Sequence, residues 1–246
     1  MHSLLLFLVA AWAGAQNALA GGGSFLILPT LMLSGMDARA ANITSCVALF
    51  PAQIAIGWTG RANADGVGAL SLRALYAISV VGGAVGAVVL LVTSSAFFAK
   101  LVPWLVLIAT VIFAWGSFLR RPGPETRHMG PVGAAVSQFL ISVYGGYFGG
   151  GAGFLIVSAL TMAGQNVRVA AATKNILAAV MNASAVLIFL FSPDLYWRDA
   201  LVTGAGAIIG GVIGARLLNR VDEKALRVVV VVIGALLTVG LFERAG

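Results

Sequence analysis

GGGSFLI at residues 21–27 and GGAGFLI at residues 150–156 are two copies of one pattern, separated by 129 positions. Each copy lies within an apolar block, 3–35 or 131–163, that is longer than the about 20 residues one membrane-spanning helix needs. A glycine inside a helix destabilises it by about 1 kcal/mol relative to alanine, so a cluster of glycines predicts a break. We therefore expect each long block to form two short helices joined by a glycine turn.

The composition places these blocks in a membrane. Only 9% of the 246 residues are charged and 60% are hydrophobic, and the mean hydropathy is +1.02. Soluble domains carry about 25% charged residues, so the sequence excludes a soluble enzyme, a disordered protein and a fibrous protein. The net charge of +7 is expected to hold loops at the cytoplasmic membrane face rather than to bind nucleic acid. The single cysteine, Cys46, excludes an internal disulfide and a cysteine-based metal cluster.

Polar residues divide the rest of the chain into six apolar blocks, each long enough for one span. These blocks cover residues 40–60, 70–92, 98–119, 168–191, 199–218 and 225–242. The expected fold is an all-α, polytopic integral membrane protein. No Lys or Arg precedes the apolar run at 4–12, so this run is expected to belong to the mature protein rather than to a signal peptide.

The match between the two long blocks extends beyond the glycines. At the same separation, identical residues occur at Leu31/Leu160, Gly35/Gly164, Arg39/Arg168, Ala41/Ala170 and Thr44/Thr173. We interpret the chain as an internal duplication, with a first repeat at 1–121, a cytoplasmic linker at 122–130 and a second repeat at 131–246. Two further glycine pairs with small-xxx-small spacing are expected to let helices pack closely: Gly82/Gly86 and Gly210/Gly214.

The distribution of basic residues favours an inverted duplication. If each long block enters and leaves on one side as a hairpin, one membrane face receives 11 Lys and Arg residues and the other receives four. If each long block crosses once, the two faces receive seven and eight. Because basic residues concentrate on the cytoplasmic side, the sequence predicts two inverted repeats, each a glycine-broken hairpin plus three transmembrane helices. Both termini then lie outside.

The two glycine breaks are candidate substrate sites. A break at membrane depth leaves backbone groups unpaired, and it persists only inside the protein or beside a water-filled cavity. The helix after each break directs its positive N-terminus at the break, which favours an anion. The alternative is that the glycines only permit close helix packing. The candidate binding residues are Gly21, Gly22, Gly23, Ser24, Gly149, Gly150, Gly151 and Gly153.

Lys174 is a basic residue well inside an apolar block. A charge within the membrane is costly and usually marks a substrate or ion path. Alternatively, Lys174 extends its ammonium group to the cytoplasmic surface. All eight acidic residues fall in loops or at helix ends, which disfavours a buried carboxylate relay and suits an anion site. Hydrogen-bonding groups for that site are added by Thr44, Ser45, Thr173 and Asn175.

Other polar residues allow weaker inferences. The two histidines, His2 and His128, lie at the terminus and in the linker, so we expect no enzyme active site, no bound metal and no cofactor. Five polar side chains can either line a path or hold two helices together: Gln16, Asn17, Asn42, Gln53 and Asn182.

These motifs resemble the sulfite exporter TauE/SafE family, also called the toluene-sulfonate uptake permease family. The first signature corresponds to residues 21–29 with Gly35, Thr44 and Ser45. The second corresponds to residues 149–156 with Thr173, Lys174, Asn175 and Asn182. The resemblance covers nearly the whole chain, and it implies transport of sulfite, organosulfonates or related small anions across a bacterial-type inner membrane.

The expected function is secondary transport of a small anion, bound near the midplane between the two glycine breaks, by alternating access. Two alternatives stay open at this point: an anion channel, and a membrane assembly or interaction protein that moves no solute. The expected partners are the small anionic substrate and the lipid bilayer, without nucleic acid. The sequence leaves the oligomeric state, the substrate and the direction of transport open.

Overall fold

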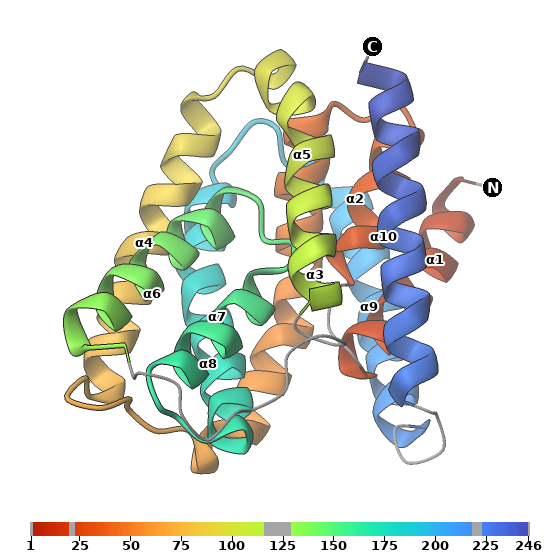
Figure 1. Ribbon diagram of the computed structural model, residues 1–246. Helices are drawn as coiled ribbons and strands as arrows, with labels where there is room; N and C mark the ends of the chain where they lie inside the picture. Colours follow the sequence, from red (N-terminus) through yellow and green to blue (C-terminus); the bar gives the residue numbers. More distant parts are fainter. Residues whose placement is uncertain (1, 20–22, 116–128, 218–222, 246) are drawn as a thin grey trace.

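The computed structural model describes residues 2–19, 23–115, 129–217 and 223–245. Within them the chain is helical, and its strand-like pairing is a single bridge between Val67 and Leu70 (Figure 1). The α-helices are α1 (His2–Leu19), α2 (Ser24–Leu33), α3 (Ala38–Gly60), α4 (Leu72–Val92), α5 (Ser95–Ala114), α6 (Pro131–Tyr147), α7 (Ala152–Met162), α8 (Val167–Phe189), α9 (Trp197–Leu217) and α10 (Glu223–Ala245). A short 3-10 helix, Arg61–Asn63, follows α3.

The predicted all-α membrane fold is confirmed. Four of the helices in the described part of the chain, α3, α4, α5 and α8, are long and apolar enough to cross a membrane. The outward face of α4 exposes large apolar side chains that would aggregate in water but suit lipid: Val80, Val81, Val85, Val88, Val89 and Val92.

The turn between α6 and α7 confirms the break predicted in the second long block. Its Gly149 and Gly151 have φ angles of +80° and +76°, a conformation that glycine adopts without the steric penalty of a Cβ atom. The corresponding change of helix in the first block falls between α1 and α2. Gly23 directly precedes α2, whereas Gly21 and Gly22 lie outside the described residues.

Helices α3 and α8 begin in the same way. The side chains of Asp37 and Asn166 accept hydrogen bonds from backbone N–H groups in the first turn of α3 and α8, respectively, and so act as N-caps. Two residues before each cap lies a glycine with positive φ, +93° at Gly35 and +98° at Gly164. Positions 129 residues apart therefore adopt the same local structure.

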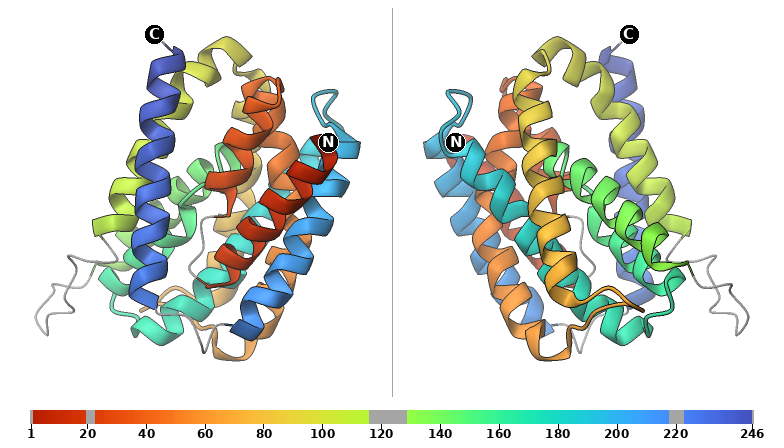
Figure 2. Two further views of the ribbon diagram at one scale, coloured as in Figure 1. Left: turned by 90° about the vertical axis from the view of Figure 1, so that its right-hand side faces the viewer. Right: turned by 90° about the vertical axis from the view of Figure 1, so that its left-hand side faces the viewer.

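Helices α3 and α8 pack against each other and run in opposite directions (Figure 2). Gln53 of α3 is hydrogen-bonded to Asn182 of α8. Gly57, one turn later in α3, faces Asn175 and Ala179, which come earlier in α8. We call the end of the bundle where α3 begins and α8 ends the first end, and the opposite end the second end.

Helix α4 runs parallel to α6 in close contact. A Cβ atom at Gly82 would lie 2.9 Å from the carbonyl oxygen of Phe139, and one at Gly86 would lie 2.1 Å from that of Val143. Real Cβ atoms cannot approach a backbone so closely, and glycine is therefore required at both positions. The packing role expected for Gly82 and Gly86 is confirmed.

Helix α1 runs parallel to α9 in the same manner. A Cβ atom at Gly206 would lie 2.5 Å from the carbonyl oxygen of Phe7, and one at Gly210 would lie 1.7 Å from that of Ala11. The packing role expected for Gly210 is confirmed, and the side-chain surroundings of Gly214 lie outside the described residues. The pairs of packed helices recur between the halves: α2 packs on α3 as α7 packs on α8, and α4 packs on α8 as α9 packs on α3.

Candidate functional site

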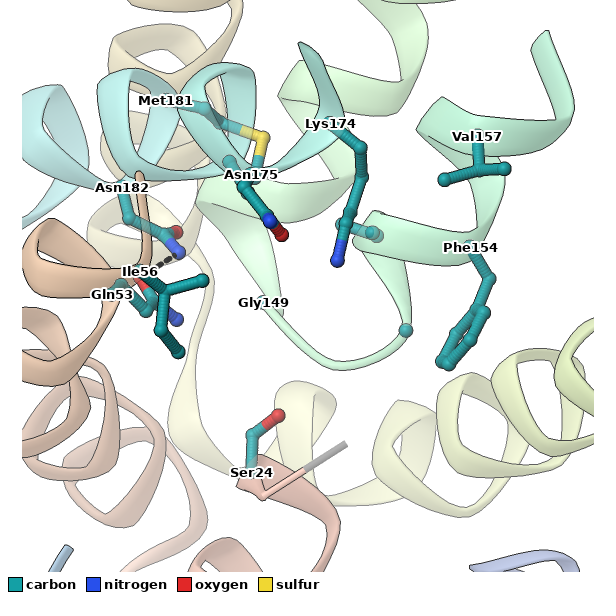
Figure 3. A pocket seen from close by; sticks show the side chains of 14 residues that line it. Ser24, Gln53, Ile56, Gly149, Phe154, Val157, Lys174, Asn175, Met181 and Asn182 are labelled. Carbon is teal, nitrogen blue, oxygen red and sulfur yellow. Dashed lines mark hydrogen bonds between the residues drawn. The ribbon is translucent and has the colours of Figure 1, made fainter. Parts of the chain in front are cut away.

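A cavity of about 130 Å³ lies where α3, α7 and α8 meet the first residue of α2 (Figure 3). On α8 its lining residues centre on Ala178, the middle residue of that helix. Its full lining consists of Ser24, Gln53, Ile56, Gly149, Gly151, Ala152, Gly153, Phe154, Val157, Lys174, Asn175, Ala178, Met181 and Asn182.

The cavity wall is partly polar and partly apolar. The polar side chains are Ser24, Gln53, Lys174, Asn175 and Asn182, and the larger apolar ones are Ile56, Phe154, Val157 and Met181. Among these lining residues none is acidic, so Lys174 provides the formal charge of the wall. Figure 3 shows Lys174 and Asn175 pointing from α8 toward Ser24, with Phe154 and Val157 on the α7 side.

The side chain of Lys174 reaches the cavity because α7 has a glycine, Gly153, where the stem of the lysine passes. A Cβ atom at Gly153 would lie 3.1 Å from Cδ of Lys174, so the absence of a side chain at Gly153 leaves room for the lysine. Within the part of the chain that the structure describes, the ammonium group makes no hydrogen bond or ion pair. Lys174 therefore brings to the cavity a basic group that has no acidic partner among the described residues.

The N-terminus of α7 adds positive potential to the same space. Gly151 precedes the helix and provides no side-chain cap, and both Gly151 and Ala152 line the cavity. A helix N-terminus carries roughly half a positive charge, and unpaired N–H groups of a first turn bind anions. The turn itself is held by the Tyr144 hydroxyl, which donates to the carbonyl oxygen of Gly150 at 2.8 Å.

Gln53 and Asn182 join α3 to α8 beside the cavity. The Nδ2 atom of Asn182 donates to Oε1 of Gln53 at 2.5 Å. Asn182 is 6% exposed, and its Oδ1 atom has no hydrogen-bond partner among the described residues. The sequence left open whether these residues line a path or hold helices together. In the structure they join the two helices and also line the cavity.

Asn42 holds the end of α6 instead of lining the cavity. Its Nδ2 atom donates to the carbonyl oxygen of Tyr147 at 3.0 Å, the last residue of α6. The contact fixes the glycine turn from the α3 side. Ser45, three residues later, donates back to the carbonyl oxygen of Asn42 at 2.9 Å and is also absent from the cavity lining.

Thr44 and Thr173 each accept a hydrogen bond from a loop, at opposite ends of the bundle. The Oγ1 atom of Thr44 accepts from the backbone N–H of Tyr196 at 3.3 Å, in the loop before α9. The Oγ1 atom of Thr173 accepts from the backbone N–H of Asp65 at 3.1 Å, in the loop before α4. Neither threonine lines the cavity.

The remaining candidates differ in whether they line the cavity. Gly149, Gly151 and Gly153 line the cavity, whereas Gly23 and Gly150 are buried beside it without lining it. Gly21, Gly22 and the side chains of Gln16 and Asn17 lie outside the described residues.

The candidate residues predicted from the sequence did not include the apolar part of the wall. Ile56, Phe154, Val157 and Met181 carry no chemical motif, but a helical periodicity connects them to the polar residues. From Lys174 and Asn175 the lining continues through Ala178 to Met181 and Asn182, which is an i, i+1, i+4, i+7, i+8 spacing along one helix face. That spacing could have identified Ala178 and Met181 as lining residues.

Comparison with known proteins identifies the family of the chain. Residues 6–241 match the model of the family described as "Sulfite exporter TauE/SafE". The chain belongs to the sulfite exporter TauE/SafE family. The match covers both glycine clusters and the helices that line the cavity, and the protein is accordingly a membrane transporter and not an enzyme.

Similar proteins from bacteria match over nearly their whole length and carry transporter names. A probable membrane transporter protein of Haemophilus influenzae is 28% identical over 243 residues, which is 95% of this chain and 92% of that protein. The probable membrane transporter protein YfcA of Escherichia coli K12 is 28% identical over 236 residues, 95% of this chain and 87% of that protein. The probable membrane transporter protein ORF9 of a Sinorhizobium species is 24% identical over 246 residues, 98% of this chain and 92% of that protein.

Proposed function

We propose that this TauE/SafE family member transports a small sulfur-containing anion, sulfite or an organosulfonate, through the cavity beside Lys174. The observation that carries the proposal is the lysine without an acidic partner among the described lining residues. A buried positive charge is costly unless it is paired. An anionic substrate would supply the missing partner during each transport cycle.

The dimensions and polarity of the cavity support a small anion. One water molecule needs about 10–15 Å³ of such volume, so about 130 Å³ accommodates a compact oxyanion with some of its water. The ammonium group of Lys174, the N-terminus of α7 and the amide of Asn175 offer donors to oxyanion oxygens. The apolar wall at Phe154 and Val157 offers space for the carbon chain of a short sulfonate.

Alternating access between two inverted repeats is the mechanism that we propose. The antiparallel packing of the counterpart helices α3 and α8 supports it, as does the recurrence of packed helix pairs between the halves. Inverted-repeat transporters hold their substrate where the repeats meet and open to one side at a time. In the proposed assignment the repeats cover residues 1–121 and 131–246, and the cavity binds substrate near the midplane.

The proposed orientation in an inner membrane places both termini outside and the 122–130 linker in the cytoplasm. The 11-to-4 division of basic residues supports it. Reporter fusions test it: alkaline phosphatase should be active when fused after residue 246, and a fluorescent protein should fluoresce when fused within the linker. An alkaline phosphatase fusion that is inactive at the C-terminus would contradict the orientation.

Flux into proteoliposomes tests the function. Purified protein should give saturable uptake of ³⁵S-labelled sulfite or a labelled sulfonate, and Lys174→Met should reduce it. Lys100→Met is the matched control, because Lys100 is exposed on α5 and distant from the lining. No flux of any sulfur anion would contradict the proposed substrate class, and steady ionic conductance in a bilayer would indicate a channel instead.

A further inference from the structure

Two charged pairs occupy corresponding positions in the two halves of the chain. Arg39 and Arg168 are the second residues of α3 and α8, and they are 129 positions apart. Asp194, in the loop after α8, and Asp65, in the loop after α3, are also 129 positions apart. Each half therefore places an arginine at one end of the bundle, opposite an aspartate from the other half.

At the first end the pair is joined. The Nη2 and Nε atoms of Arg39 lie 2.8 and 2.9 Å from Oδ2 of Asp194. The Nη1 atom of the same guanidinium donates to the carbonyl oxygens of Thr93 at 2.8 Å and Leu91 at 3.3 Å. Arg39 thus joins three segments at the first end of the bundle: the start of α3, the α8–α9 loop and the C-terminal end of α4.

At the second end the corresponding pair is apart. Arg168 and Asp65 are both exposed, and no ion pair between them is formed. The carboxylate of Asp65 instead accepts the backbone N–H of Gly66 at 2.7 Å. The residues that correspond to Leu91 and Thr93, at 220 and 222, lie outside the described residues.

The surroundings of the two pairs are alike in part. Asp37 and Asn166 cap the two helices that carry the arginines, and Thr44 and Thr173 hold the loops that carry the aspartates. The loops themselves differ, because the Asp65 loop contains a 3-10 helix and the Val67–Leu70 bridge and its Asp65 and Gly66 carbonyl oxygens accept from Nε2 of Gln165. The ion pair is therefore one of the differences between the two ends.

We propose that Arg39–Asp194 and Arg168–Asp65 are two alternating gates, the first closed in this conformation and the second open. The inference rests on the proposed transport function. A partly exposed ion pair is weak, and a gate must be weak, because a strong pair would hold the transporter in one state. Forming one pair while breaking the other would keep the two states close in free energy.

The native cysteine is a reporter for this exchange. Cys46 corresponds to Asn175, which lines the cavity. In this conformation Cys46 lies against the glycine turn, where a Cβ atom at Gly149 would be 3.3 Å from its Sγ atom. When the first end opens, Cys46 should take the place that Asn175 has now and become accessible from that end. Thiol reagents reach only accessible cysteines.

The test is the rate at which a membrane-impermeant maleimide labels Cys46 in right-side-out and inside-out vesicles of the full-length protein. Asp194→Asn should increase labelling from the first-end side by about threefold or more, since a partly exposed pair shifts an equilibrium by about this factor. Asp65→Asn is the matched control and should leave that rate unchanged or lower it. Cys46→Ser defines the background.

Two further variants decide whether the pair itself acts as the gate. Arg39→Gln should reproduce the effect of Asp194→Asn, and the reversed pair Arg39→Asp with Asp194→Arg should return the labelling rate toward wild type. Labelling in detergent normalises for the amount of folded protein. Wild-type rates in both single variants, an equal increase with Asp65→Asn, or failure of the reversed pair to restore protection would overturn the proposal.

The labelling experiment is independent of the substrate. Because no anion is added, failure of the gate would appear as unchanged labelling in a protein that still transports. Failure of the proposed function would appear as absence of flux in a protein whose labelling follows the expected pattern.

Discussion

The two glycine-broken hairpins share a framework but differ in the side chains that face the helix behind them. In the second half Gly153 leaves room for the stem of Lys174. The corresponding positions of the first half hold Ser24 and Ser45, and Ser45 is turned away from the cavity toward its own backbone. The two halves therefore offer similar backbones, and among the described lining residues the basic side chain comes from the second half.

Of the substitutions that test this difference, Gly151→Leu should reduce transport most. The residue has a φ of +76°, a conformation that is strained by about 1–3 kcal/mol for a residue with a Cβ atom, and a leucine there would also fill the cavity. We expect transport to be abolished while protein remains in the membrane, and the same change at Gly22 in the first half should also abolish it. Gly130→Leu is the control, since that position has open space and a φ of −62°. Normal flux in Gly151→Leu would remove the turn from the site.

Lys174→Met should have the next largest effect on transport, through weaker binding of the anion. The variant keeps most of the apolar stem but loses the charge, and a hydrogen bond to a charged group contributes about 1.5–3 kcal/mol. We expect the apparent affinity for the transported anion to fall about tenfold or more. Lys174→Arg should keep part of the activity with altered selectivity, because the guanidinium is larger and planar. Unchanged affinity in the methionine variant would show that the lysine does not contact substrate.

Gly153→Ala should weaken binding by a smaller factor. The added Cβ atom would lie 3.1 Å from Cδ of Lys174, so the flexible stem must move by a few tenths of an ångström. We expect a two- to fivefold loss of apparent affinity, which corresponds to about 0.4–1 kcal/mol, since 1.4 kcal/mol is tenfold. Gly240→Ala, at a position with open space, should leave the affinity unchanged. Equal affinities in both variants would indicate that the lysine is not confined by α7.

Thr44→Val and Thr173→Val should have the smallest effect on binding. Each removes an acceptor for a loop N–H group, and a typical hydrogen bond contributes about 0.5–1.5 kcal/mol to stability. We expect slightly lower thermal stability in both variants and an unchanged apparent affinity. A tenfold loss of affinity in either variant would place that threonine in contact with substrate and contradict its role as a loop anchor.

The sequence predicted the helices more completely than the site. Helix length and hydropathy are local properties, so the apolar blocks and the glycine break at residues 149–151 could be read directly. Contacts between distant segments are not local, and the sequence could not show that Thr173 would anchor Asp65. Helix geometry explains why these two candidates separate: Thr173 and Asn175 are two residues apart, so they point about 200° apart around α8, and of the two Asn175 lines the cavity.

The sequence did not predict the ion pair at the first end either. Arg39 and Arg168 match in sequence, but a match between two halves does not reveal that Arg39 is paired while Arg168 has no ion pair among the described residues. The pairing of Arg39 with Asp194 therefore required the structure.

The most direct test of the central claim is a crystal structure with a transported anion that scatters anomalously, such as selenite or a bromo-substituted sulfonate. The anomalous peak should lie in the cavity, within hydrogen-bonding distance of Nζ of Lys174 and beside the N-terminus of α7. It should be absent in crystals of Lys174→Met. A peak elsewhere in the bundle, or one that is unchanged in the methionine variant, would contradict the assignment of Lys174 and the glycine turn as the anion site.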